Sequence, residues 1–134
     1  MKLTYEISKA VNYLILKVKG EYAIEDFLEI IKRIPGECQR LNTFNVLADL
    51  RGITLHSFIP FMDRIRMGKT TARFLGPKIK IAALSLPEFI HQDKVGELTA
   101  RIRSAELKVF SDEKEAVDWL LEKVAVGKVV SDDV

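Results

Sequence analysis

The chain has few of the residues that mark disulfide-bonded, metal-binding or membrane-spanning proteins. It contains one cysteine and two histidines in 134 residues, which excludes an intrachain disulfide and predicts no zinc site. No apolar run approaches the roughly 20 residues of a membrane-spanning helix. We therefore expect no transmembrane segment and no cofactor. The single cysteine, Cys38, has no neighbouring cation in the sequence to activate its thiol, so we interpret it as a reduced bystander.

The charge balance also excludes a class of partner. Lysine and arginine number 21, aspartate and glutamate 19, and the formal net charge is +2. This balance is too mild to predict a nucleic-acid partner. The residues 1–4 alternate like a strand and do not open like a signal peptide, so we expect a cytoplasmic protein. A hydrophobic content of 48% and a charged content of 30% are typical of a globular chain.

Hydrophobic periodicity predicts one α/β domain over residues 1–124, followed by a C-terminal tail at 125–134. The expected strands cover 3–7, 13–20, 44–50, 80–84 and 107–110. The expected helices cover 24–34 and 57–75, a stretch running from an S-x-x-E cap at 85–88 through residue 102, and a last helix containing 116–120. Pro35-Gly36 is expected to end the first helix, and Ser111-Asp112 to cap the last. The order ββαβαβαβα predicts a mixed, mainly parallel sheet with covering helices and with 44–50 at its centre.

Two junctions in this order carry a family resemblance. One strand ends in Asp49-Leu50-Arg51, and the stretch 109–112 (Val-Phe-Ser-Asp) leads into 116–120 (Ala-Val-Asp-Trp-Leu). Over residues 3 to 123 the chain resembles the SpoIIAA-like branch of the STAS superfamily. The resemblance implies a STAS-like fold and a non-enzymatic module, since STAS domains serve as anti-sigma-factor antagonists, transporter appendages and sensors. Their lipid-binding cousins are carriers.

The chain departs from this family at the phosphorylation site. Phosphorylated STAS proteins carry a serine at a helix start a few residues after the Asp-Leu strand, and that position falls near Phe58. Ser57, one residue earlier, is the candidate for phosphorylation, which the amides of a helix start would favour. The ordinary alternative is that Ser57 caps the helix.

The helix expected at 57–75 carries the candidate interaction surface. Its basic residues are followed by no acidic residue after Asp63 as far as Lys80. Arg66, Lys69 and Arg73 are three and four residues apart and share one helix face, which suits an acidic protein partner or an anionic ligand. A solvated helix exterior is the alternative. The candidate binding residues are Arg64, Arg66, Lys69, Arg73, Phe61 and Ile65.

The same helix has more bulky apolar residues than one narrow buried stripe requires. A stripe of six is expected to be buried: Phe58, Phe61, Met62, Ile65, Ala72 and Leu75. Met67 and Phe74 add to it, so part of this surface can face a lipid, a protein partner or a second copy in a homodimer. A carrier of a small apolar or lipid-like ligand is the main rival, and it predicts a cavity lined by Phe61, Ile65 and Phe74.

An enzyme is the weaker rival. Gly68-Lys69-Thr70 resembles the end of a phosphate-binding loop, but it lies inside a predicted helix whose amides are already used. A hydrolase built on Ser57 or His91 needs a cleft that joins several polar side chains. The sequence therefore predicts a non-enzymatic binding or regulatory module that acts through the helix 57–75.

Overall fold

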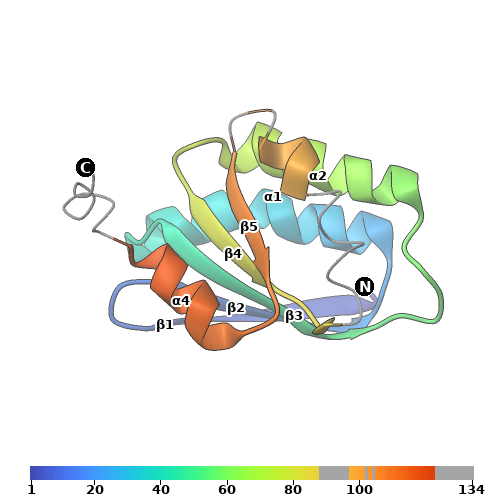
Figure 1. Ribbon diagram of the computed structural model, residues 1–134, viewed down its shortest axis with the longest axis horizontal. Helices are drawn as coiled ribbons and strands as arrows, with labels where there is room; N and C mark the ends of the chain where they lie inside the picture. Colours follow the sequence, from blue (N-terminus) through green and yellow to red (C-terminus); the bar gives the residue numbers. More distant parts are fainter. Residues whose placement is uncertain (88–96, 102, 104, 123–134) are drawn as a thin grey trace.

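A central sheet with helices on both faces organises the chain (Figure 1). This computed structural model describes residues 1–87, 97–101, 103 and 105–122. The strands are β1 (Leu3–Lys9), β2 (Leu14–Glu21), β3 (Asn45–Thr54), β4 (Lys80–Leu84) and β5 (Glu106–Phe110). They lie in the order β1-β2-β3-β4-β5. β1 is antiparallel to β2 and every other pair is parallel, which confirms the predicted hairpin, the mixed sheet and the central place of β3.

The helices form two layers. Helices α1 (Ile24–Leu41) and α2 (Phe61–Leu75) pack together on one face, and α4 (Glu113–Leu120) covers the other (Figure 1). Residues 97–101 are helical, as the predicted third helix requires. The remainder of that helix, its cap at 85–88 and the tail at 125–134 include positions outside the described residues. Within the part that the structure describes, no helix is long and apolar enough to cross a membrane.

Helix α1 is longer than its sequence predicts. Pro35-Gly36 was expected to end it, but the helix continues to Leu41 and ends at Asn42, which has a left-handed φ of 49°. Proline removes one backbone donor. Continuing the helix keeps Ile30, Ile34 and Cys38 on one buried face, and this burial outweighs the lost hydrogen bond.

Helix α2 begins later than predicted, and a different face of it is buried. The predicted start at Ser57 is wrong because Pro60 disfavours a helical conformation at the residue before it, so the helix begins at Phe61. Ser57 is exposed in the loop and does not cap the helix. The inward residues of α2 are Gly68, Thr71 and Leu75. The predicted buried stripe is therefore wrong in its first half, where the structure exposes the aromatic residues.

Contacts of Asp26 and Lys80 link helices α1 and α4 to the sheet. At the first turn of α1, the Asp26 carboxylate accepts hydrogen bonds from the backbone N–H groups of Lys2 (2.5 Å) and Leu3 (3.1 Å). On the opposite face, Lys80 donates to the Trp119 carbonyl at 2.6 Å, and its Nζ lies 4.4 Å from the centre of the Trp119 ring. Lys80 therefore anchors α4 and is not part of a free basic surface.

Candidate functional site

Three large apolar side chains are exposed where the chain enters α2. Phe58, Phe61 and Met62 are 74%, 58% and 63% exposed, and we call them the α2 entry surface. Phe58 lies in the loop before Pro60, and the other two lie in the first turn of the helix. Single exposed apolar residues are common, but a group of aromatic and methionine side chains is typical of a binding surface.

The predicted basic residues of α2 differ in what they contact. Arg66 pairs with Glu25 of α1, with Nη2 to Oε2 at 3.1 Å, and so links the two helices. The Arg73 guanidinium lies 5.5 Å from the centre of the Phe74 ring. Lys69 is exposed and has no ion pair among the described residues. All three side chains are exposed, and Lys69 and Arg73 are the two that form no ion pair among the described residues.

Arg64 departs from the expected surface. It is partly buried and lines a cavity beneath the helix, whereas Lys69 and Arg73 are exposed. The structure thus exposes four of the six predicted binding residues, namely Phe61, Arg66, Lys69 and Arg73, with Arg66 in contact with α1. It leaves Arg64 and Ile65 partly buried.

The first turn of α2 is fixed to the loop that follows β2. The Tyr22 hydroxyl donates to the Asp63 carboxylate at 2.8 Å. Burial, followed by the bond to this carboxylate, raises the pKa of Tyr22 well above its ordinary value. Tyr22 is therefore neutral in ordinary buffers and remains a donor. The negative charge of Asp63 also interacts favourably with the positive end of the helix dipole. The first turn of α2, which carries part of the α2 entry surface, is therefore held in place.

A cavity of about 120 Å³ lies between the sheet and the two helices α1 and α2. Its floor is a row of residues in register across four strands, namely Leu16 (β2), Ala48 (β3), Ala83 (β4) and Val109 (β5). The two alanines occupy the middle of this row. On α2, Gly68 and Thr71 also line the cavity. Small side chains on both sides therefore leave the space empty.

The size of the cavity indicates what it costs in stability and how large a ligand it could hold. At about 24 cal/mol per Å³, an empty space of 120 Å³ costs on the order of 3 kcal/mol relative to a filled core. A cavity of this size is comparable to one that holds a benzene molecule. The expected lining is wrong, because none of Phe61, Ile65 and Phe74 contributes to the wall. Two of the three point outward instead, with Phe61 and Phe74 exposed.

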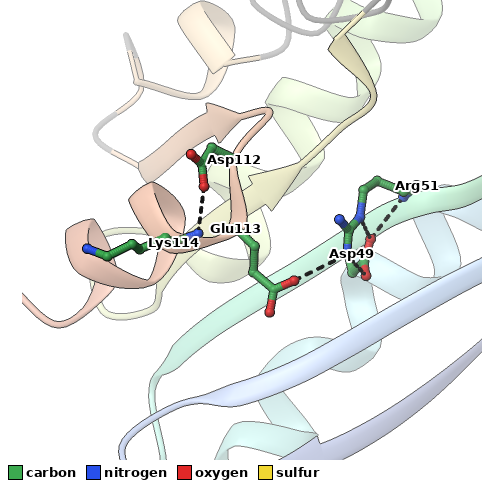
Figure 2. A network of polar contacts seen from close by, with 5 residues as sticks. All are labelled: Asp49, Arg51, Asp112, Glu113 and Lys114. Carbon is green, nitrogen blue, oxygen red and sulfur yellow. Dashed lines mark hydrogen bonds and ion pairs between the residues drawn. The ribbon is translucent and has the colours of Figure 1, made fainter.

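A polar network joins the middle of β3 to the start of α4 (Figure 2). Arg51 donates to both oxygens of Asp49 at 2.9 Å, and its Nη2 lies 3.3 Å from Glu113. The Arg51 hydrogen bond is the main cause that holds the pKa of Asp49 below its ordinary value. Asp112 accepts from the Lys114 N–H at 2.9 Å, which confirms the predicted cap. A carboxylate so engaged is a poor general base, so the network is structural.

We expect Asp49→Asn to remove part of the acid sensitivity of the fold. Because the folded-state pKa of Asp49 is lowered, its contribution is present above the ordinary pKa of 3.8 and is lost as the pH falls through the folded-state value. Arg51 is partly exposed, so the loss at neutral pH is on the order of 1 kcal/mol. Urea unfolding between pH 2 and pH 7 measures the effect. Equal pH slopes for the variant and the wild type below pH 4 would contradict this prediction.

The residues considered for catalysis do not form a site in the described part of the chain. His56 lies 3.7 Å from Glu21 on the surface, and His91 lies outside the described residues. Burial raises the pKa of the Cys38 thiol to about 11, and Glu37 adds to this rise. The described residues contain no group of three histidine, cysteine or acidic side chains that could hold a metal ion. Ser57 is exposed, and its phosphorylation stays a prediction.

Comparison with known proteins agrees with this fold. The family model described as SpoIIAA-like matches residues 13–121, and the chain belongs to the SpoIIAA-like family. The crystal structure of an anti-sigma factor antagonist from Mycobacterium paratuberculosis is similar, with a TM-score of 0.57 and 13% identity over 88% of this chain and 93% of that one. An uncharacterised protein of the DUF3478 family with a SpoIIAA-like fold, from Shewanella loihica PV-4, has 20% identity, the same coverage and a TM-score of 0.49. None of the curated proteins matches the chain.

Proposed function

We propose that this protein is a non-enzymatic regulatory module that binds a protein partner through the α2 entry surface. The exposure of Phe58, Phe61 and Met62 is the observation that carries the proposal. Membership of the SpoIIAA-like family supports it, since one protein of the same fold is an anti-sigma factor antagonist and such a role is exercised on another protein.

The chemistry of the surface indicates what kind of partner fits it. Aromatic side chains contribute strongly to protein interfaces when they enter a pocket, and methionine adapts to irregular ones. Lys69 and Arg73 are exposed on the same helix, and no acidic residue occurs from position 64 to position 80. We therefore propose a partner with an apolar pocket that is bordered by acidic side chains.

Crosslinking at Phe61 tests the proposal in two steps. A photoreactive amino acid at position 61 should capture a defined protein in the cells of origin, whereas the same amino acid at Val11 should not. Val11 is 88% exposed and lies in the turn before β2, at the opposite end of the sheet from the start of α2. With the captured protein purified, Phe61→Ala should weaken binding by about 10- to 100-fold in calorimetry, and Val11→Ala should leave it unchanged.

Charge reversal tests the expected character of the partner. The pair Lys69→Glu and Arg73→Glu should slow association and remove most of its salt dependence. Binding that is unaffected by both Phe61→Ala and this reversal would exclude the α2 entry surface. Capture of a second copy of the chain in place of another protein would replace the proposal with self-association.

A further inference from the structure

We propose that the cavity beneath α2 is a binding site for one small, uncharged, apolar molecule, and that its occupancy alters the α2 entry surface. The first half of the proposal stands on the cavity alone. The second half rests on the docking function proposed above.

The wall of the cavity indicates an apolar ligand. Most of the residues that line it are aliphatic, and its five polar residues already have partners within the protein, namely Tyr22, Arg64, Thr71, Ser85 and Glu97. The Tyr22 hydroxyl donates to Asp63, the Thr71 hydroxyl donates to the Met67 carbonyl at 2.8 Å, and the Glu97 carboxylate accepts from the Val109 N–H at 2.7 Å. A charged ligand would have to compete with these bonds, whereas an apolar one leaves them intact.

The volume sets the upper size of the ligand. Close-packed interiors rarely leave a gap much larger than a water molecule, so about 120 Å³ of apolar space is unusual. An engineered apolar cavity of about 150 Å³ in another protein stays dry and binds benzene or xenon. Met67 lies in the wall, and its flexible side chain lets the cavity adapt to different shapes. Molecules about as large as benzene, or smaller, therefore fit this site.

The same segment of the chain forms both the cavity and the exposed surface. Ile59, Met67 and Gly68 line the cavity, while Phe58 and Phe61 are exposed beside them in the sequence. Tyr22 also lines the cavity, and it holds the first turn of α2 through Asp63. An occupant that presses on this wall therefore acts on the element that carries the α2 entry surface.

Methyl NMR with benzene as the probe tests the site directly. In the full chain labelled at isoleucine, leucine and valine methyl groups, benzene should give saturable shifts at Leu16, Ile31 and Val109, which line the cavity. Leu47 and Leu120, in the core beneath α4, should not shift. Absence of saturable shifts, or shifts spread equally over both faces of the sheet, would overturn the proposal.

Filling the cavity provides the matched variant. Ala83→Leu should abolish the benzene shifts and raise the Tm, because its side chain enters empty space. Ala48→Val is a second, smaller filling if the leucine does not fold. Ala82→Val is the control, since Ala82 is fully buried on the α4 face and has no space to fill. It should lower the Tm and keep the benzene shifts. Benzene shifts that persist when the cavity is filled would overturn the site.

Hydrogen exchange separates the two halves of the proposal. Saturating benzene should slow amide exchange in α2 by at least about threefold, and Ala83→Leu alone should reproduce the change. Saturable methyl shifts without any change in α2 would keep the site and refute its link to the surface. Because this readout needs no partner, failure of the docking function would not be mistaken for failure of the cavity site.

Discussion

Gly20→Ala is expected to lower the free energy of unfolding by about 3 kcal/mol or more. Gly20 has a φ of 121°, a conformation that side chains rarely adopt. An added Cβ would also collide with the carbonyl oxygen of Lys2. Gly20 is paired with Leu3 on one side and Ile53 on the other, so neither neighbour can move without disturbing the sheet. Urea unfolding of the variant and the wild type measures the loss.

Gly36→Ala is the control for the glycine substitution itself. Gly36 lies inside α1, and an added Cβ would meet no atom within 4 Å. Alanine favours the helix over glycine, so this variant should be more stable by about 0.5–1 kcal/mol. The two variants make the same chemical change and should shift the urea midpoint in opposite directions. A shift of the same sign for both would show that local geometry at Gly20 is not the cause.

Leu47→Ala is expected to cost about 2–5 kcal/mol of unfolding free energy. Leu47 lies on β3 and is 2% exposed, in the core formed with Leu84, Phe110 and Leu120 beneath α4. Removing its side chain leaves a cavity that the rigid centre of the sheet cannot close. The urea midpoint should fall, and the slope of the transition should stay unchanged.

Phe61→Ala is the control that separates a residue needed for folding from one available for binding. Phe61 is a larger residue than Leu47, but it is 58% exposed, so its loss should change the free energy of unfolding by about 0.5 kcal/mol or less. A side chain that adds little to folding yet stays apolar at the surface is expected to serve binding. A cost close to that of Leu47→Ala would make Phe61 a structural residue and remove the basis of the docking proposal.

The strands could be predicted because their signals are local. Residues 80–84 form a short apolar run and residues 107–110 alternate in polarity, and the structure places strands at both. The central position of β3 followed from its nearly continuous apolar character, which a strand needs when helices cover both faces. The Asp112 cap was also predictable, because the acceptor and the amide it satisfies are two residues apart.

The helix errors arose where tertiary packing overrides local preference. Pro35 is a local signal for a helix end, but the burial of Cys38 one turn later keeps α1 going. In α2, spacing alone cannot tell which of two apolar stripes faces the sheet. The spacing of the large residues predicts that they are the buried ones, whereas Gly68 and Thr71 are the α2 residues that face the cavity above the sheet.

The candidate site was predictable only in part for a related reason. Phe61, Lys69 and Arg73 were identified because a single helix carries them. The cavity arises from Ala48 and Ala83, which the register of β3 and β4 brings side by side, together with Gly68 on α2. The Tyr22–Asp63 bond joins residues 41 positions apart. Alanines inside two buried strands and a glycine inside a helix were the available signal, but their meeting depends on the sheet register.

The Asp26 carboxylate has a consequence for how the protein resists aggregation. β1 is one of the two edge strands, and an open strand edge is a template on which another chain can add. By accepting hydrogen bonds from the Lys2 and Leu3 amides, Asp26 occupies the donors with which such an addition would begin. These two bonds also lower the pKa of Asp26, so the carboxylate keeps its charge in mildly acidic conditions. One side chain on the first turn of a helix thus keeps two backbone donors at the start of an edge strand from pairing with another chain.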